Sequence, residues 1–246
     1  MRSRLRLVLF IQTALIVALV GVIFRQQLNH YKEINQFRLD PFEENKLHSL
    51  RGSGDNDLWI IGDSRAEQWN ASFLRPIKTN VYNLGIAGQS TKQVLERFED
   101  NLETHCPKYV VIQVGINDLK NIGILDGERI AVDCLENTVR IVDLCKRRGI
   151  IAIYTSIFPV GTVSLLRKPF WDESIRDSIR HVNMKVKEYC FDKGIYYFDS
   201  YSILSDDENQ DIVKPEYQRD FLHINREGYK LLSAKLSVFL SDNSIP

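Results

Sequence analysis

Four short polar segments of the chain carry side chains that can take part in acyl transfer. They are Gly62-Asp63-Ser64, Asn83-Leu-Gly85-Ile-Ala-Gly88, Gly115-Ile-Asn117-Asp118 and Asp220-Phe-Leu-His223. A serine hydroxyl is a weak nucleophile by itself, so a mechanism based on Ser64 needs a base and donors that stabilise an oxyanion. Asp63 and Ser64 are also typical of the start of a helix. The first segment therefore has to be judged together with the others.

The spacing of Asp220 and His223 suits an acid–base pair. Side chains three residues apart in a turn or a helical segment fall on the same side. The Asp220 carboxylate can then accept the Nδ1–H of His223, which leaves Nε2 to take a proton from Ser64. We assign a surface or helix-capping role to the other histidines, which have no comparable acidic partner. They are His30, His48, His105 and His181.

Gly88 and Asn117 are candidate donors to an oxyanion. Asn117 offers a side-chain amide, and Gly88 offers a backbone N–H in a loop free of Cβ crowding. Both residues also suit ordinary turns, because Gly-x-Asn-Asp is favourable turn chemistry. Each segment thus has a structural explanation of its own, but these explanations do not account for the occurrence of all four segments in this order.

Five short apolar segments predict the strands that position these side chains. They are residues 58–61, 80–84, 109–114, 150–154 and 195–198. Ser64 follows the first predicted strand, Gly88 lies in the loop after the second, and Asn117 follows the third. The carboxyl ends of parallel strands open on one edge of a sheet, so these residues and the Asp220–His223 pair can converge there.

Helical patterns alternate with the predicted strands. Residues 91–105 and 128–148 place apolar side chains on one face. A third helix has its apolar face from Ile175 to Val186 and is stopped by Gly194. Asn225 is a favourable N-cap for a final helix that reaches Leu240. Strands that alternate with helices of this length predict a parallel sheet covered on both sides. We expect one three-layer α/β/α domain with five strands over residues 58–246.

An apolar segment near the N-terminus predicts a transmembrane anchor. Residues 7–24 would span roughly 27 Å as a helix, enough for a bilayer core. Residues 1–6 then form a cytoplasmic tail, and residues 25–57 a juxtamembrane stalk and linker. We favour an anchor over a cleaved secretory signal, because the segment is long and no A-x-A-like site follows it. In either case the catalytic domain, residues 58–246, lies outside the cytoplasm.

The composition is that of an ordinary globular protein and does not suggest a nucleic-acid partner. Of 246 residues, 44% are hydrophobic, and the chain has 32 basic and 32 acidic side chains. The four cysteines lack the spacing of metal ligands, and their disulfide state stays open, with buried free thiols as our expectation. They are Cys106, Cys134, Cys145 and Cys190.

The four segments, taken in order, resemble those of the SGNH (GDSL-type) hydrolases. The set is far more specific than any one segment, and the resemblance covers about residues 58–240. It implies a flavodoxin-like α/β/α fold with Ser64 as nucleophile and His223 as base, oriented by Asp220. It implies neither a metal nor an organic cofactor.

The same resemblance implies an oxyanion hole made by the Ser64 N–H, the Gly88 N–H and the Asn117 side chain. The chain departs from the pattern at Arg65, where relatives usually have leucine. Arg65 can meet an anionic group of a substrate or pair with a neighbouring acid, so the departure bears on substrate preference.

The substrate is expected to be an ester, and the sequence indicates only where it would bind. Four apolar residues in or near the loop after the fourth strand can line an acyl pocket or cover the core. They are Leu165, Leu166, Phe170 and Trp171. Family analogy and the anchor suggest O-acylated cell-envelope glycans or lipids. An O-acyltransferase with the same triad and an inactive anchored binding module are the alternatives, and the oligomeric state stays open.

Overall fold

The structure is a computed structural model. It describes residues 2–38, 56–74, 79–123, 126–165, 168 and 171–245. The chain forms two units, Met1–Arg38 and Leu39–Pro246, and each is described by itself below.

The first unit is one helix, α1 (Arg2–Arg38). Its segment Arg6–Gln27 has a mean hydropathy of 2.8 and is long and apolar enough to cross a membrane, a test that a signal sequence also passes. The hydroxyl of Thr13, one of the few polar groups in this segment, donates to the carbonyl of Leu9 at 2.9 Å. The helix includes the predicted anchor, residues 7–24, and continues to Arg38. Most of the predicted linker lies outside the described residues.

Five parallel strands form one sheet in the described part of the second unit. They are β1 (Leu58–Gly62), β2 (Val81–Asn83), β3 (Tyr109–Gln113), β4 (Ile151–Thr155) and β5 (Tyr196–Phe198), in the spatial order β2-β1-β3-β4-β5. The central pair, β1 and β3, is in register from Leu58 opposite Tyr109 to Gly62 opposite Gln113. The predicted five-stranded parallel sheet is confirmed, with strand ends that differ by no more than one residue.

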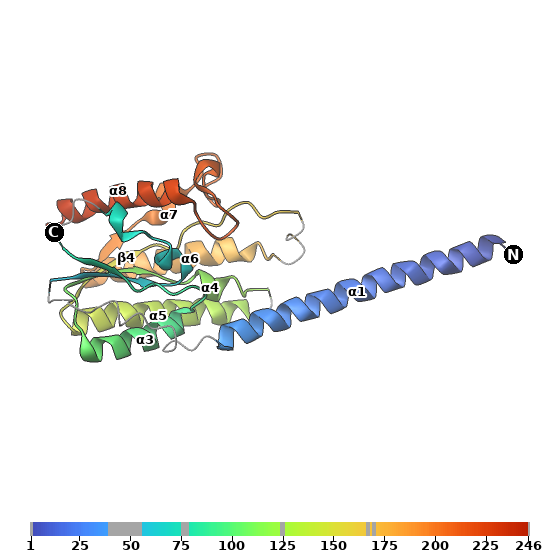
Figure 1. The fold of residues 1–246 in the computed structure, drawn as a ribbon, viewed down its shortest axis with the longest axis horizontal. Helices are drawn as coiled ribbons and strands as arrows, with labels where there is room; N and C mark the ends of the chain where they lie inside the picture. The colour runs from blue at the N-terminus through green and yellow to red at the C-terminus, as the bar shows by residue number, and fades with distance from the viewer. Residues whose placement is uncertain are drawn as a thin grey trace. The chain divides into compact units, whose positions relative to one another are not determined.

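Side chains of the central strands alternate between two apolar cores because successive residues of a strand point to opposite faces. Trp59 and Ile61 lie in one core, and Leu58 and Ile60 lie in the other. The long helices are α3 (Thr91–Thr104), α5 (Gly127–Arg147), α6 (Ser174–Lys193) and α8 (Arg226–Asp242). Residues of α3, α5 and α6 complete the first core, whereas α8 completes the second, so helices cover both faces of the sheet (Figure 1).

Short elements fill the loops at the sheet edge. They are α2 (Ser64–Glu67), η2 (Ala71–Phe73), α4 (Ile116–Leu119), α7 (Ser200–Leu204) and η4 (Pro215–Tyr217). Asn225 caps α8 as predicted, because its side chain accepts hydrogen bonds from the backbone N–H groups of Glu227 and Gly228. All four cysteines are free thiols; Cys106 is exposed and the other three are buried.

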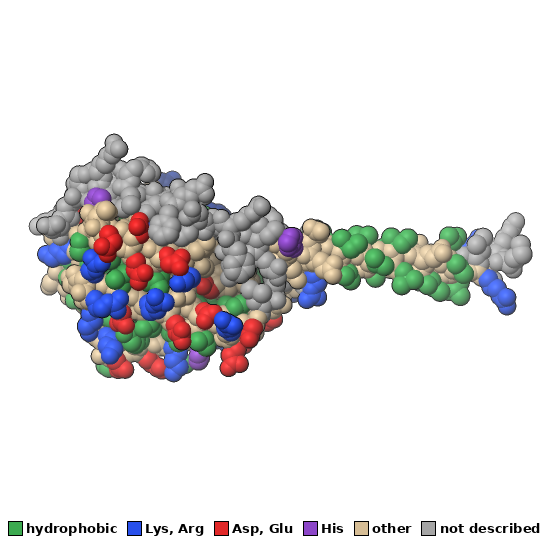
Figure 2. All heavy atoms as spheres, turned by 90° about the horizontal axis from the view of Figure 1, so that it is seen from below, with side chains coloured by type: hydrophobic (Ala, Val, Ile, Leu, Met, Phe, Trp, Pro, Cys, Tyr) green, Lys and Arg blue, Asp and Glu red, His purple; other side chains and the backbone are tan. Residues whose placement is uncertain are grey.

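Acidic and basic side chains are interspersed on the face of the second unit shown in Figure 2, whereas apolar side chains cover much of α1. The large apolar side chains of α1 from Leu7 to Phe24 are about half to three-quarters exposed. This face of the second unit shows no field of a single sign, as the balanced composition indicated.

Candidate active site

Ser64 is held at the carboxyl end of β1 by a sharp turn. Gly62 has a φ of +146°, and a Cβ at this position would lie 1.8 Å from the carbonyl oxygen of Gln113 on β3. Only glycine fits this approach. Asp63 then caps α2 by accepting the backbone N–H of Arg65 at 2.8 Å, and Ser64 becomes the first residue of that helix.

The strand order places Ser64 where α/β sheets bind ligands. In the order 2-1-3-4-5 the chain leaves β1 for one neighbour and later returns to its other side, which opens a crevice between β1 and β3 at their carboxyl ends. Ser64 directly follows β1, and Asn117 lies in α4, just after β3. The two central strands therefore bring Ser64 and Asn117 to the same edge of the sheet, as the sequence predicted.

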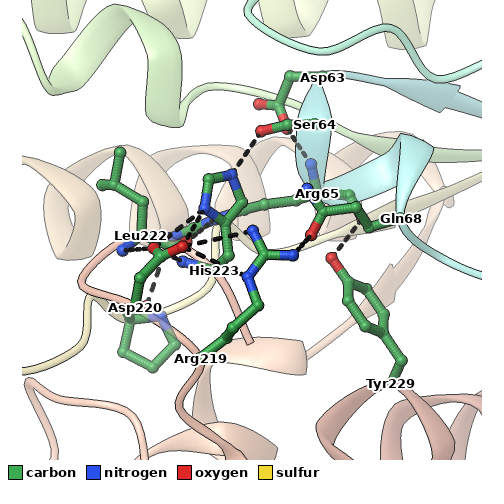
Figure 3. A network of polar contacts seen from close by, with 10 residues as sticks. Asp63, Ser64, Arg65, Gln68, Arg219, Asp220, Leu222, His223 and Tyr229 are labelled. Atoms are coloured by element: carbon green, nitrogen blue, oxygen red, sulfur yellow. Dashed lines mark hydrogen bonds and ion pairs between the residues drawn. The ribbon is translucent and has the colours of Figure 1, made fainter. Parts of the chain in front are cut away.

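The structure brings Ser64, His223 and Asp220 into one hydrogen-bonded chain (Figure 3). The Ser64 Oγ lies 2.9 Å from the His223 Nε2, and the His223 Nδ1 lies 3.0 Å from both carboxylate oxygens of Asp220. An Nδ1–H that faces a carboxylate leaves Nε2 unprotonated. This geometry allows the imidazole to accept the hydroxyl proton of Ser64.

Asp220 is fixed by the backbone of its own turn. Its Oδ1 accepts the backbone N–H groups of Leu222 at 2.8 Å and of His223 at 2.9 Å, and the Arg219 guanidinium lies 3.3 Å from Oδ2. Burial raises the pKa of Asp220, but the bonds from Leu222 and His223 outweigh it, so the pKa lies below its ordinary value. Asp220 is therefore a carboxylate at neutral pH.

His223 is neutral under the same conditions. Burial lowers its pKa below the ordinary value of 6.5, and although Asp220 opposes this shift, the charges of Arg65 and Arg219 add to it. A neutral imidazole is the form that accepts a proton. The electrostatics of the site thus match the proton-accepting geometry.

Asn117 lies in α4, just after β3, and Gly88 lies in a turn between β2 and α3. Gly88 has a φ of +82°, which favours glycine. The buried Asn117 donates from Nδ2 to the Gln89 carbonyl at 3.0 Å, and its Oδ1 accepts Lys120 Nζ at 2.6 Å. The side-chain amide nitrogen of asparagine carries two hydrogens, and among the described residues Nδ2 of Asn117 has one acceptor, the Gln89 carbonyl. Its second N–H is available to an oxyanion.

Asn83 is the first residue of the second segment, and the sequence indicated no role for it. In the structure its Nδ2 donates to the carbonyls of Ala66, Glu67 and Trp69, at 2.8, 3.2 and 2.7 Å. Its Oδ1 accepts the N–H of Gly85 at 2.9 Å. Asn83 thus joins the end of α2 to the loop that contains Gly88. Its position before two motif glycines was the only signal that could have identified it.

Asp118 is a second residue whose role the sequence did not identify. Its carboxylate accepts the backbone N–H and the hydroxyl of Thr91, at 2.9 and 2.7 Å, which ties α4 to the start of α3. Burial raises the pKa of Asp118 to about 6, against the opposing effect of the Thr91 bonds. Asp63 is also buried, and its pKa is likewise raised to about 6 by desolvation.

Arg65 does not make the substrate contact that was one of its two expected roles. Its side chain is fully buried, and Nε donates to the Leu222 carbonyl and Nη1 to the Phe158 carbonyl, both at 2.9 Å. A longer bond of 3.4 Å reaches the carbonyl of Pro159. The guanidinium is thus satisfied inside the protein, where it links α2 to two distant loops, and it presents no surface to a substrate.

The four apolar candidates for an acyl pocket have separate outcomes. Leu165 is 81% exposed. Trp171 is half-buried against the first core and packs edge-to-face on Phe221, with ring centroids 5.9 Å apart. Leu166 and Phe170 lie outside the described residues. Trp171 therefore covers the core and supports the segment between Asp220 and His223.

Within the described ranges, no group of three or more His, Cys, Asp or Glu side chains is arranged to hold a metal ion. The acidic side chains near Ser64 have partners instead: Asp220 binds His223, and Asp118 binds Thr91.

Comparison with known proteins identifies the family. The model of the GDSL-like lipase/acylhydrolase family matches residues 51–231, and the chain belongs to this family. No curated protein sequence matches the chain.

Solved structures share the fold at low sequence identity. A GDSL-like lipase from Bacteroides thetaiotaomicron is 22% identical over 80% of this chain and 98% of its own, with a TM-score of 0.65. An acetylxylan esterase from Geobacillus stearothermophilus, solved as a catalytic mutant, is 16% identical over 78% and 95% of the two chains, with a TM-score of 0.60. These structures support the α/β fold of this family.

Proposed function

We propose that the chain is a serine esterase that cleaves acyl or acetyl esters through an acyl-serine intermediate. The observation that carries the proposal is the continuous chain from Ser64 Oγ through His223 to Asp220, with bonds of 2.9 and 3.0 Å. Membership of an acylhydrolase family supports the reaction class.

The reaction proceeds in two steps, acylation of Ser64 and hydrolysis of the acyl-serine. Ser64 Oγ attacks the ester carbonyl carbon while its proton moves to His223 Nε2, and the carbonyl oxygen becomes an oxyanion. Collapse breaks the bond to the alcohol, which leaves with the proton from His223. Water then attacks the acyl-serine and gives one proton to His223. The bond between the acyl carbon and Ser64 Oγ breaks, Oγ takes the proton back from His223, and the acid is released.

The oxyanion is stabilised by hydrogen-bond donors from the segments that follow β1, β2 and β3. We assign this role to the backbone N–H groups of Ser64 and Gly88 and to the side-chain amide of Asn117. Asn117 is buried, and one of its two amide N–H groups is used to hold it against the Gln89 carbonyl. A donor that is held in place before the reaction does not have to reorganise in the transition state.

The substrate class that we propose is an O-acyl or O-acetyl ester on a cell-envelope glycan or lipid, reached from the membrane. The apolar helix α1 supports an anchored position. We place the catalytic unit on the extracytoplasmic side as part of this proposal. Similarity in fold to an acetylxylan esterase is compatible with an acetylated glycan.

Hydrolysis of p-nitrophenyl esters by the full chain in mild detergent tests the proposal. We expect turnover that Ser64→Ala abolishes, and a comparison of acetyl with long-chain esters separates glycan-type from lipid-type acyl groups. Asn70→Ala, which removes a surface cap of η2, is the control for substitution near the site. A folded wild-type protein without ester hydrolysis, or a Ser64→Ala variant that retains it, contradicts the proposal.

A further inference from the structure

The ammonium group of Lys120 contacts Asn117, one of the proposed oxyanion donors. It follows α4 directly as the C-cap residue, three positions after Asn117, so the two side chains share one side of the turn. Its Nζ donates to the Asn117 Oδ1 at 2.6 Å, which is short for a bond of this kind. The side chain of Lys120 is half-buried.

The partners of Asn117 fix which way its amide points. A lysine ammonium only donates hydrogen bonds, so it must face the amide oxygen. The Gln89 carbonyl only accepts, so it must face the nitrogen, and it does so at 3.0 Å. The backbone carbonyl of Asn117 is held in turn by Asn121 Nδ2 at 2.8 Å. These contacts fix the orientation of the Asn117 side-chain amide, and with it the direction in which the second N–H of Nδ2 can donate.

The charge of Lys120 also matters because two buried acids lie close to the same loops. Asp63 and Asp118 are buried, and a carboxylate there opposes the formation of an oxyanion nearby. The positive charge of Lys120 interacts favourably with both acids. A cation at this position therefore offsets negative charge where the reaction creates more of it.

We infer that Lys120 is a positioning residue for oxyanion stabilisation, acting through the amide of Asn117. A charge-assisted bond to the amide oxygen polarises the amide and makes its free N–H a stronger donor. The oxyanion exists only in the transition state and the tetrahedral intermediate, so the benefit lies in kcat rather than in substrate binding. This inference rests on the proposed esterase function.

Three substitutions separate the charge of Lys120 from its hydrogen bond. Lys120→Arg keeps both, Lys120→Gln keeps a donor without the charge, and Lys120→Met removes both. Loss of an entire oxyanion donor costs roughly 100- to 1,000-fold in kcat, so we expect a smaller loss, about 10- to 100-fold, for the methionine variant. The glutamine variant should fall between methionine and arginine, and KM should change by less than about threefold.

Two readouts distinguish this role from a merely structural one. A thionoester carries sulfur in place of the carbonyl oxygen, and sulfur is a weak hydrogen-bond acceptor. Lys120→Met should therefore reduce turnover of an oxygen ester more than turnover of its thionoester. In an Asn117→Ala background the same substitution should have little further effect, because the amide through which it acts is missing.

The experiment uses the full chain and p-nitrophenyl acetate, with Lys185→Met as the control that removes an exposed lysine of α6. Suppose that the wild-type protein hydrolyses the oxygen ester. If Lys120→Met then reduces turnover of the oxygen ester and of the thionoester equally, the inference is overturned and the esterase function stands. The same holds if Lys120→Met causes its full loss of turnover in the Asn117→Ala background. Unchanged kcat in Lys120→Gln and Lys120→Met also overturns it. A wild-type protein without ester turnover contradicts the proposed function itself, and the inference fails with it.

Discussion

The protonation state of one residue, His223, controls the proposed chemistry. Burial lowers its pKa below 6.5, and Arg65 and Arg219 lower it further against the opposing effect of Asp220. Below that pKa the imidazole is protonated and cannot accept the hydroxyl proton of Ser64. Acid should therefore remove activity with a midpoint below the ordinary histidine pKa of 6.5.

We predict that kcat/KM for a neutral ester rises with pH to a plateau, with a midpoint below 6.5, which is the pKa of His223 in the free protein. Arg219→Gln removes a charge that lowers this pKa, so the midpoint should move upward. pH–rate profiles at constant ionic strength measure both values. The control is Arg129→Gln, which removes an exposed arginine of α5 and should leave the midpoint unchanged. A wild-type midpoint above 6.5, or no shift in Arg219→Gln, contradicts this explanation.

At the scale of elements, the position of Ser64 depends on how the short helix α2 is tied to its surroundings. A helix of four residues has little stability of its own, so its neighbours must hold it. Asn83 binds three carbonyls at its end, and Arg65 joins its first turn to Phe158 and Leu222. Tyr229 of α8 adds a bond of 2.9 Å to the Arg65 carbonyl.

Arg65→Lys should destabilise the protein although it preserves the charge. Burial lowers the pKa of Arg65 to about 10, so the guanidinium remains charged at neutral pH. One ammonium cannot reach carbonyls on both sides as the planar guanidinium does, and each buried carbonyl left unpaired costs about 1–3 kcal/mol.

We expect a loss of about 2–4 kcal/mol in the free energy of unfolding for Arg65→Lys, measured by urea denaturation of the full chain. Ester turnover should fall as well, because the Leu222 carbonyl precedes His223. The matched control is Arg148→Lys, because Arg148 forms an exposed ion pair with Glu103. This substitution should lower the free energy of unfolding by less than about 1 kcal/mol. Equal stability of the two variants speaks against a structural role for Arg65.

At the scale of the whole molecule, the proposal of a membrane anchor rests on the apolar segment of α1. The segment Arg6–Gln27 comprises 22 residues and would span roughly 33 Å, about the thickness of a bilayer core. We predict that the full chain keeps its N-terminal segment and remains in the membrane pellet after an alkaline carbonate wash. Intact mass measurement checks the first point, and a mature chain that starts after α1 contradicts it.

The free thiols of the second unit provide a topology test. Cys106 is exposed, whereas Cys134, Cys145 and Cys190 are buried. A membrane-impermeant maleimide should label Cys106 in intact cells if the catalytic unit is extracytoplasmic. Cys106→Ser is the control, because any label on this variant must be on one of the three buried thiols. Labelling that requires cell lysis contradicts this orientation.

Local patterns determined much of the fold. Runs of apolar residues and helical periodicity predicted the five strands and the long helices, and their ends were displaced by one or two residues because pairing at a strand end depends on its neighbours. The short helix α7 was missed, since its five residues show no periodicity that distinguishes them from a loop. The family and its α/β fold followed from four segments whose residue types are demanded by tight turns and acyl-transfer chemistry.

Only the tertiary structure decided what the polar residues around Ser64 do. The roles of Ser64, Asp220 and His223 stay a prediction, but their proximity is observed across 159 positions of sequence. Arg65 has partners 93 and 157 positions away, so nothing near it in the chain could distinguish a buried tie from a substrate contact. Turn and strand preferences act between neighbouring residues and can be recognised in a sequence. The partner of a buried charge depends on which distant loops meet at the sheet edge.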